Sequence, residues 1–255
     1  MVYCLLFVVG FGYWVPNDEQ QTDHVQMEIR VDSLIEGAKR AKGTVVIIDV
    51  YRAFTTASVA FEQGVSKILF VSTIEEALEA KASGLADYCV GEVDGIPPQG
   101  FDFGNSPYEL SKVDLAGKVI VHRTSAGTVG VTAAAGAEHI YGGALVNARA
   151  TVNHVLASRP SLVTIVAMGL NGVTRTDEDE QCALYMRNLL LGRRPDKEHV
   201  RELVKAGKET DKFLDPAKPH FHPEDVEYAL RINSIAQPLR IVKQDGFLQA
   251  QKIAG

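Results

Sequence analysis

Short apolar runs alternate with longer amphipathic segments along most of the chain. Runs rich in Val and Ile are typical of buried strands, and apolar positions three or four residues apart are typical of helices. Because the two patterns alternate, they predict βαβ units and a three-layer α/β/α fold with a mostly parallel sheet, and a mixed sheet is left open. The predicted strands lie at 28–32, 44–49, 67–71, 87–91, 118–122, 138–141 and 162–168. The predicted helices lie at 33–41, 55–63, 74–83, 127–136, 147–158 and 177–191.

A capping box marks the start of one of these helices. Thr73 is followed three residues later by Glu76. In this arrangement each side chain bonds to the free backbone amide of the other residue. We therefore expect the helix to begin directly after Thr73.

The first 26 residues differ from the rest of the chain. Val2 to Val15 form an apolar stretch that is too short to span a bilayer and lacks the basic region and cleavage site of a signal peptide. After a polar run, the alternation typical of a strand begins at Met27. We interpret residues 1–26 as an N-terminal extension before a start at Met27, or as an extra strand.

The pattern changes again after residue 192. Gly192 to Pro195 interrupts the helical periodicity, and 196–235 carries many charges and three prolines. We expect an α/β core at 27–192 that carries the chemistry, followed by a C-terminal segment at 193–255 that forms a helical lobe or cap. No candidate for the chemistry is identified in that last segment.

The composition is that of an ordinary globular protein. The 255 residues are 46% hydrophobic and 23% charged, and the formal net charge is −6. An acidic chain has little positive surface with which to neutralise nucleic acid, so we expect no nucleic-acid partner. No apolar run is long enough for a membrane span, so we expect no membrane partner. Cys4, Cys89 and Cys182 include no CxxC pair, which argues against a disulfide framework or zinc site and favours a cytoplasmic location.

The first group of candidate residues follows the apolar strand at 44–48. Ligands of parallel α/β sheets bind beyond the carboxyl ends of the strands, and that position holds Asp49, Arg52, Thr55 and Thr56. A carboxylate at the end of an apolar strand loses part of its hydration, so we expect Asp49 to bind a cation or to pair with Arg52. Thr55 and Thr56 bind an anion in one interpretation and cap the next helix in the other.

The second group lies in a loop at 91–107 that contains four glycines and three prolines. Loops of this length without regular structure are often functional. Mg²⁺ prefers oxygen ligands and takes one or two carboxylates, so this loop and Asp49 together are candidates for a magnesium site. We interpret Asp94 as a solvated acid and favour the other two acids as ligands. The loop's candidate oxygen ligands are Glu92, Asp94, Asp102, Asn105 and Ser106.

The third group follows the strand at 118–122. Backbone N–H groups at a helix N-terminus, together with a glycine and hydroxyl groups beside a guanidinium, are typical of an anion-binding turn. The alternative is a capped helix start with an exposed arginine. The spacing is not that of a Walker A motif, and we expect His122 to pack inside the protein. The candidate residues are Arg123, Thr124, Ser125, Gly127 and Thr128.

The fourth group is a run of four acids, Asp177 to Glu180, that opens the helix at 177–191. Acids in a first turn interact favourably with the helix dipole, so about half of the run needs no functional explanation. Successive helical residues point about 100° apart, so at most two of the four can face one site. We favour Glu178 and Asp179 as those two, Thr176 as the helix cap, and Cys182 as a buried apolar residue.

Taken together, these four segments resemble the 2-phosphosulfolactate phosphatase family. The resemblance extends from about Met27 to about Leu190, and the loop that ends in G-F-D-F-G-N-S-P is its most specific part. The motifs are I-D-V-Y-R-A-F-T-T at 48–56, G-E-V-D-G-I-P-P-Q-G-F-D-F-G-N-S-P at 91–107, R-T-S-A-G-T at 123–128 and E-D-E-Q-C-A at 178–183.

This resemblance implies an Mg²⁺-dependent hydrolase that removes phosphate from (2R)-phospho-3-sulfolactate, a step of coenzyme M biosynthesis, or from a related phosphorylated hydroxy acid. It implies a small anionic substrate, and a homo-oligomer is left open. The expected metal ligands are Asp49, Glu92, Asp102 and Glu178. The expected catalytic residues are Asp49, Arg52 and Asp102, the last as a third ligand or a general base. The expected substrate-binding residues are Arg52, Thr55, Thr56, Asn105, Ser106, Arg123, Thr124, Ser125, Gly127 and Thr128.

Two other functions remain open. A haloacid-dehalogenase-like phosphatase would use Asp49 to attack phosphorus, although Tyr51 stands where the second acid of that motif is expected. A non-catalytic protein that binds anions on the same fold would use the same turn without turnover. A cysteine phosphatase is not expected, because Cys182 and Arg187 have the wrong spacing for a C-x5-R loop.

Overall fold

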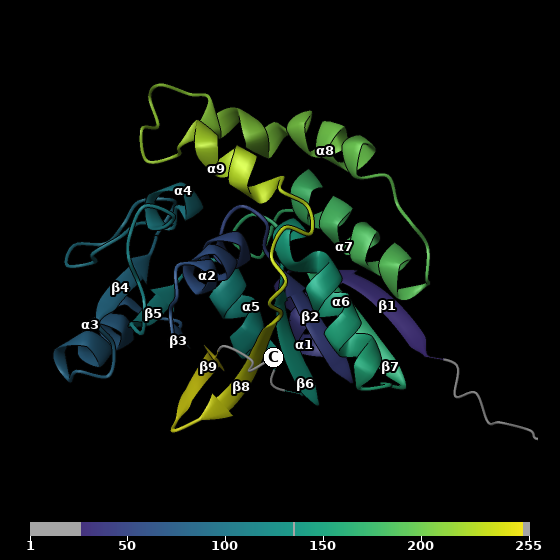
Figure 1. Ribbon diagram of the computed structural model, residues 1–255, viewed down its shortest axis with the longest axis horizontal. Coiled ribbons are helices and arrows are strands. Elements are labelled where there is room, and N and C mark those ends of the chain that lie inside the picture. The colour runs from purple at the N-terminus through teal and green to yellow at the C-terminus, as the bar shows by residue number, and fades with distance from the viewer. Residues whose placement is uncertain (1–26, 135, 252–255) are drawn as a thin grey trace, which may run out of the picture.

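The computed structural model describes residues 27–134 and 136–251. Figure 1 shows a central sheet with helices on both sides. The strands are β1 Glu28–Ser33, β2 Thr44–Ile48, β3 Lys67–Val71, β4 Tyr88–Gly91, β5 Val119–Arg123, β6 His139–Gly143, β7 Leu162–Ala167, β8 Leu239–Gln244 and β9 Phe247–Gln251. The helices are α1 Leu34–Arg40, α2 Ala53–Glu62, α3 Ile74–Ala82, α4 Pro107–Leu110, α5 Gly127–Ala133, α6 Ala148–Ala157, α7 Asp177–Leu190, α8 Lys197–Lys205 and α9 Pro223–Ala229, with 3-10 helices η1 Leu145–Asn147 and η2 Lys208–Phe213.

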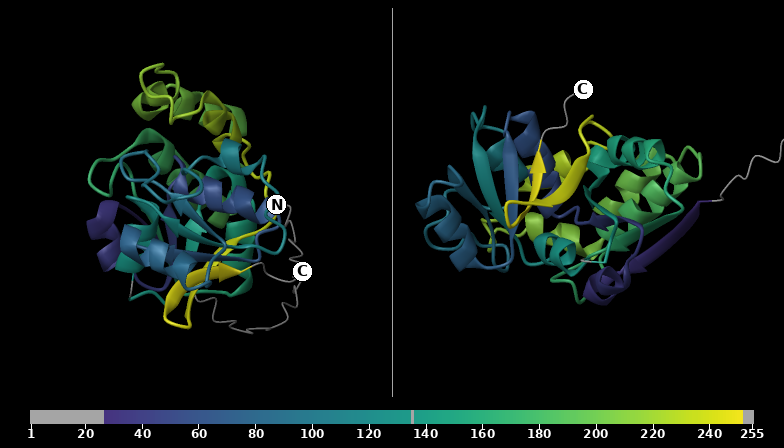
Figure 2. Two further views of the ribbon diagram at one scale, coloured as in Figure 1. Left: turned by 90° about the vertical axis from the view of Figure 1, so that its left-hand side faces the viewer. Right: turned by 90° about the horizontal axis from the view of Figure 1, so that it is seen from below.

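The sheet consists of two parallel groups of strands joined by an antiparallel hairpin. Its order is β1-β7-β2-β6-β8-β9-β3-β5-β4. β1, β7, β2 and β6 pair in parallel, as do β3, β5 and β4, whereas β8 pairs antiparallel with β6 and β9 antiparallel with β3. Figure 2 shows the hairpin between the two groups. The predicted α/β fold with a mostly parallel, mixed sheet is therefore confirmed.

The strand β2 shows why helices cover both faces of the sheet. All five of its residues are buried, and successive side chains point to opposite faces. Val45 and Ile47 belong to an apolar core that includes Phe54 of α2, while Val46 and Ile48 belong to a second core on the other face. A strand buried on both sides is typical of parallel sheets covered by helices.

The predicted capping box is present at the start of α3. The Thr73 hydroxyl accepts a hydrogen bond from the Glu76 amide at 3.2 Å, and the Glu76 carboxylate accepts one from the Thr73 amide at 3.1 Å. The predicted strands and helices of 28–191 all correspond to observed elements, with ends that differ by a few residues. The prediction for residues 1–26 lies outside the described residues.

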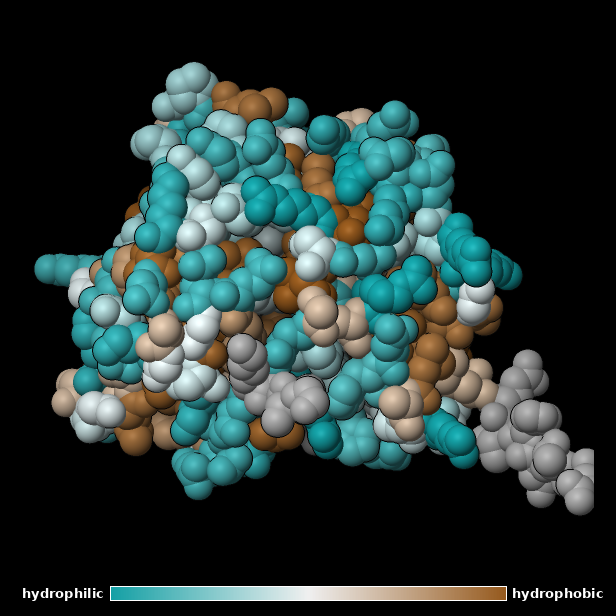
Figure 3. Space-filling view, in the orientation of Figure 1, coloured by the Kyte–Doolittle hydropathy of each residue, from teal (hydrophilic) through white to brown (hydrophobic). Residues whose placement is uncertain are grey.

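The C-terminal segment has two parts. Residues 197–229, called the cap below, form α8, η2 and α9, in agreement with the helical character predicted for this segment. They lie at the top of the molecule in Figure 1. The prediction was wrong for the residues that follow, because 239–251 form the hairpin β8–β9 inside the sheet. Hydrophilic residues cover most of the face drawn in Figure 3. Within the described residues, no helix combines the length and apolar character needed to cross a membrane.

Candidate active site

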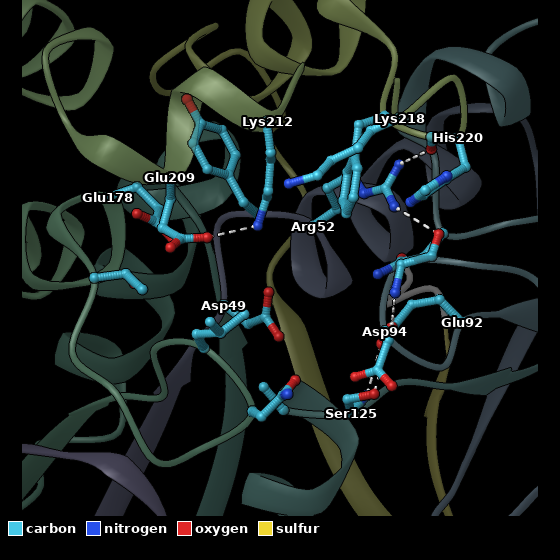
Figure 4. Close-up of a pocket in the computed structure, with 18 of the residues that line it drawn as sticks. Asp49, Arg52, Glu92, Asp94, Ser125, Glu178, Glu209, Lys212, Lys218 and His220 are labelled. Atoms are coloured by element: carbon cyan, nitrogen blue, oxygen red, sulfur yellow. Dashed lines mark hydrogen bonds and ion pairs between the residues drawn. The ribbon is translucent and has the colours of Figure 1, made fainter. Parts of the chain in front are cut away.

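A cavity of about 760 Å³ lies between the core and the cap (Figure 4). Its core side is formed by residues that follow β2, β4, β5 and β7, which is where ligands bind in α/β sheets. Its other side is formed by η2 and the residues after it. The residues around the cavity include Asp49, Tyr51, Arg52, Glu92, Asp94, Gly95, Asn105, Ser125, Ala126, Gly169, Thr176, Glu178, Lys208, Glu209, Lys212, Lys218, His220 and Phe221.

Asp49 is a buried carboxylate at the bottom of this cavity. Its side chain accepts a hydrogen bond from the Ala53 amide at 3.0 Å. The pKa of Asp49 is raised to about 6, mainly by burial and also by the charge of Glu92, while the Ala53 and Gly127 amides and Lys212 lower it. A Cβ atom on Gly127 would lie 2.9 Å from an Asp49 carboxylate oxygen. Glycine therefore allows the N-terminus of α5 to approach Asp49 closely.

The acidic start of α7 contributes one side chain to the cavity and one to the scaffold. Glu178 lines the cavity, and burial raises its pKa to about 7. Asp179 accepts hydrogen bonds from the Val50 amide at 2.7 Å and the Gly169 amide at 2.8 Å. It thereby joins the segments that follow β2 and β7. Of the two acids favoured from the sequence, Glu178 lines the cavity and Asp179 does not.

Glu92 connects the long loop to the turn that precedes α5. Its two carboxylate oxygens accept hydrogen bonds from the Ser125 amide and the Gly95 amide, both at 2.7 Å. Ser125 and Gly95 line the cavity together with Glu92. These bonds fix the shape of the cavity wall, and they use the oxygen atoms that were expected to bind a metal ion.

Asn105 reaches the cavity from the far end of the same loop. Its side-chain oxygen lies 3.2 Å from Nε2 of His122, which is fully buried, as expected. Burial lowers the pKa of His122 to about 4, so the ring is neutral at pH 7 and Nε2–H donates to Asn105. His122 thus orients a residue that lines the cavity.

Asp102 lies outside the cavity, so the structure does not bring this expected ligand or general base together with Asp49 and Glu178. The loop folds back along β4, so that the Asp102 amide donates to the Cys89 carbonyl at 3.0 Å. The Asp102 carboxylate accepts a hydrogen bond from the Cys89 amide and pairs with Lys81. This backfolding places Asp102 beside the middle of β4, whereas the exposed Asp94 lines the cavity at the carboxyl end.

Arg52 lines the cavity but does not pair with Asp49. Its guanidinium forms a buried ion pair with Asp225 of α9 at 2.8 Å and donates to the carbonyl oxygens of His220 at 3.1 Å and Gly95 at 3.4 Å. Both side chains of the ion pair are at most 3% exposed. The alternative of a structural Asp49–Arg52 pair is therefore wrong, and Arg52 connects the core to the cap.

Several expected substrate-binding residues have structural roles instead. The Thr55 hydroxyl donates to the Val50 carbonyl at 2.8 Å, and the Thr128 hydroxyl donates to the Thr124 carbonyl at 2.8 Å. Ser106 caps α4 and donates to Asp225 at 2.6 Å. Because these hydroxyls are occupied by the scaffold, the part of the expected anion-binding turn that lines the cavity is reduced to Ser125 and Ala126. The expected substrate-binding residues that do not line the cavity are Thr55, Thr56, Ser106, Arg123, Thr124, Gly127 and Thr128.

The expected four-carboxylate metal site is not assembled. Within the described residues, no group of three or more His, Cys, Asp or Glu side chains is arranged to hold a metal ion. Glu92 is bonded to amides and Asp102 lies beside β4. Asp49 and Glu178 remain as the two members of the expected set that line the cavity and are neither bonded through both oxygens to the Ser125 and Gly95 amides, as Glu92 is, nor placed beside β4, as Asp102 is.

The cap supplies functional candidates that the sequence analysis missed. Lys208, Glu209, Lys212, Lys218 and His220 line the cavity opposite Asp49. The sequence does contain a signal. Residues 208–220 include three lysines and a histidine, and they belong to a proline-rich stretch that also contains aromatic residues. Nothing in the sequence, however, indicates which part of the sheet this stretch covers.

Comparisons with known proteins agree with the resemblance. The family described as 2-phosphosulpholactate phosphatase matches residues 30–236 of the chain. The probable 2-phosphosulfolactate phosphatase of Bacillus subtilis (strain 168) is 32% identical over 205 residues, which cover 79% of this chain and 87% of that protein. The proteins of the same name from Deinococcus radiodurans and Thermotoga maritima are 37% identical over 153 residues and 39% identical over 129 residues. Those matches cover 60% and 51% of this chain, and 63% and 55% of the relatives. The chain therefore belongs to the 2-phosphosulfolactate phosphatase family, a family of phosphoric monoester hydrolases.

Proposed function

We propose that this protein hydrolyses (2R)-phospho-3-sulfolactate, or a related phosphorylated hydroxy acid, to the hydroxy acid and phosphate, with Mg²⁺ as its cofactor. The observation that carries the proposal is the cavity itself, in which the buried Asp49 faces Lys212 of the cap. A phosphomonoester with further acidic groups needs several cations and oriented amides for binding. The names of the family and of its relatives supply the substrate.

The chemistry of the acids in the cavity fits Mg²⁺. This ion is usually bound by one or two carboxylates, with water and substrate phosphate completing its coordination. Asp49 and Glu178 are buried, and burial raises the pKa of both by more than the charge of Lys212 lowers it, so a bound cation would compensate them further. We assign these two residues to the ion, which would stabilise negative charge on the phosphoryl oxygens.

We assign the remaining roles in substrate binding and phosphoryl transfer to residues of the chain itself. We assign the Ala126 amide to a phosphoryl oxygen, because Ala126 lines the cavity whereas the Ser125 and Thr128 amides already donate to Glu92 and Thr124. Arg52 is held at the cavity wall by Asp225, which compensates its charge. Tyr51 cannot serve as the second acid of a covalent phosphatase, since its hydroxyl lies 3.3 Å from that of Thr210 and burial raises its pKa. Direct transfer of the phosphoryl group to water is the mechanism we favour.

The proposal is tested by measuring phosphate release from phosphorylated small acids, with Mg²⁺ and with EDTA. We expect release that requires Mg²⁺, and Asp49→Asn is expected to lower kcat by about two decades or more while the protein stays folded. Asp196→Asn is the matched control, because Asp196 is an exposed N-cap of α8 outside the cavity and Asn caps equally well. Undiminished kcat in Asp49→Asn, or equal loss in both variants, contradicts the role of Asp49.

A further inference from the structure

The strand β1 forms one border of the sheet (Figure 2). Among the strands that the structure describes, only β7 pairs with it. The Glu28 amide donates to the Ser161 carbonyl at 2.8 Å, so in this parallel ladder the backbone groups of Glu28 and Arg30 point toward β7. The amides and carbonyls of Ile29 and Val31 therefore point away from the sheet. Such an edge is a template for pairing with another strand.

Apolar and charged side chains alternate from Met27 to Val31. Met27 and Ile29 pack against the core that contains the buried residues of α7, and Val31, on the same face, is 37% exposed. Glu28 and Arg30 lie on the other face, where they form an exposed ion pair at 2.7 Å. Proline and lysine, which often protect edge strands from pairing, do not occur in β1. The edge of β1 is therefore open to a second strand.

The charges of β1 restrict how it can pair with a second copy of itself. In an antiparallel pair about a twofold axis, residues at equal distances on either side of the axis lie opposite each other. An axis at Arg30 would place Glu28 opposite Asp32 of the second copy, and like charges opposite each other are destabilising. An axis at Ile29 places Glu28 opposite Arg30 of the second copy, and symmetry forms this pair twice. The charges therefore exclude the axis at Arg30 and favour the axis at Ile29.

The backbone groups favour the same axis. With the axis at Ile29, the outward amides and carbonyls of the two Ile29 residues bond to each other, and those of Val31 bond to Met27 of the second copy. An axis at Val31 also pairs opposite charges, but it requires the Ser33 amide as a donor. That amide already donates to the Asp32 carboxylate at 2.8 Å. Of the three axes, only the one at Ile29 satisfies both the charges and the backbone.

The helix α7 extends the surface beside β1. It packs on β1 and runs in the opposite direction (Figure 1). The Ser33 hydroxyl donates to the Glu180 carboxylate at 2.6 Å, so the side of α7 that carries Glu180 faces the edge. Leu184 and Leu191 follow on that side, about one and three turns further along, and are 43% and 44% exposed.

These two leucines lie at the right places for a twofold axis at Ile29. A strand rises about 3.3 Å per residue and a helix about 1.5 Å, so the distance from Ser33 back to Ile29 corresponds to about nine helical residues after Glu180. That point is close to the midpoint between Leu184 and Leu191. The axis at Ile29 therefore brings Leu184 of one copy next to Leu191 of the other.

We propose that two copies of this chain associate through β1, antiparallel about a twofold axis at Ile29, so that their two sheets become one. The α7 helices of the two copies pack against each other across the axis. A pair of short strands alone buries less than the roughly 800 Å² per partner of a stable interface, so the leucines of α7 supply the rest. The inference does not depend on the proposed function, because no residue of β1 lines the cavity.

The first experiment measures the association of the full chain by sedimentation velocity at micromolar concentrations, where we expect a dimer. Glu28→Arg and Arg30→Glu each place like charges opposite each other twice per dimer, so each is expected to weaken association about tenfold or more. Neutralising one charge, as in Glu28→Gln, has little effect because the pair is exposed. Lys118→Glu is the control, since it breaks another exposed pair, with Asp87, at the opposite border of the sheet. A monomer at every concentration, or equal weakening by the control, overturns the proposal.

The two charge reversals are complementary to each other. In an equimolar mixture, the arginines at positions 28 and 30 of the Glu28→Arg variant face the acids at positions 30 and 28 of the Arg30→Glu variant. We therefore expect mixed dimers that associate about as tightly as the unchanged protein. Absence of mixed dimers, although each reversal alone dissociates the dimer, excludes this pairing of the strands.

Two further comparisons test the leucines and the axis without reversing a charge. Leu184→Lys is expected to weaken association about tenfold, whereas Leu203→Lys, on α8 and 39% exposed, is expected to leave it unchanged. Ile29→Cys is expected to link two chains on oxidation, because the axis brings its Cα within about 5.5 Å of the Cα in the second copy. Val31→Cys lies too far from its copy to be linked. Linkage of Val31→Cys in place of Ile29→Cys, or equal weakening by the two lysine variants, overturns the arrangement.

Discussion

The buried ion pair between Arg52 and Asp225 is predicted to anchor the cap to the core. Asp225 is fully buried and accepts three hydrogen bonds, from Arg52 at 2.8 Å, from the Ser106 hydroxyl at 2.6 Å and from the Tyr108 amide at 3.2 Å. These partners lie in the segment after β2, at the end of the long loop and in α4. Asp225 therefore joins α9 to both parallel groups of strands.

The substitution Asp225→Asn removes the charge and keeps the shape. The oxygen of Asn can still accept from Ser106 and Tyr108, but its NH₂ group then faces the Arg52 guanidinium, donor against donor. Breaking a buried ion pair from one side costs about 3–5 kcal/mol, because the remaining charge is left without compensation. Since each kcal/mol lowers Tm by about 2–4 °C in a protein of this size, we expect a decrease in Tm of about 6–20 °C.

The assay is urea and thermal unfolding followed by circular dichroism. Glu28→Gln is the control, because the Glu28–Arg30 pair is more than half exposed on both sides, and such surface pairs contribute little. Arg52→Met and the double variant complete a thermodynamic cycle, in which the double variant is expected to lose less stability than the sum of the single variants. Additive losses, or an Asp225→Asn variant as stable as Glu28→Gln, would refute the anchoring role.

Two further predictions concern His122 and Gly95. The pKa of His122 is about 4 in the folded protein, below its usual 6.5, so its contribution is complete above pH 6.5 and is lost as pH falls toward 4, by roughly 3 kcal/mol in total. His122→Gln, which keeps a donor for Asn105, should flatten urea-unfolding stability over this pH range, and an unchanged pH profile contradicts the prediction. Gly95→Ala should lower the free energy of unfolding by about 1–3 kcal/mol through backbone strain and a clash with Phe221. Gly84→Ala shares the strain, at φ +79°, but has open space around its Cβ, so equal losses in the two variants would exclude the clash.

The regular elements of the core could be predicted because each has a local cause. The β-branched run of β2 is buried on both faces, and Asp49 follows directly from its place at the end of that strand. The hairpin β8–β9 also has a local signal, since Asp245 and Gly246, both with positive φ, separate two short strands as in a type I′ turn. The charges and prolines before it, in contrast, favour a helical segment.

The candidate site could be predicted only in part, because its geometry depends on long-range folding. Glu92 and Asp102 lie in one loop and look equivalent in the sequence, but the return of the loop along β4 carries Asp102 away from the cavity. Arg52 lines the cavity, yet its partner, Asp225, lies 173 residues later. Lys212 likewise reaches the cavity through the packing of the cap, which no local pattern encodes.

The position of the hairpin β8–β9 also determines when the sheet can be completed during synthesis of the chain. In the part of the chain that the structure describes, β6 and β3 are joined only through β8 and β9. A nascent chain therefore holds two separate sheets, each with an unpaired edge strand, until residues 239–251 have left the ribosome and entered between them. Unpaired edges invite pairing with other chains. Shortening the protein from its C-terminal side is thus expected to produce aggregation during synthesis before it affects any residue that lines the cavity.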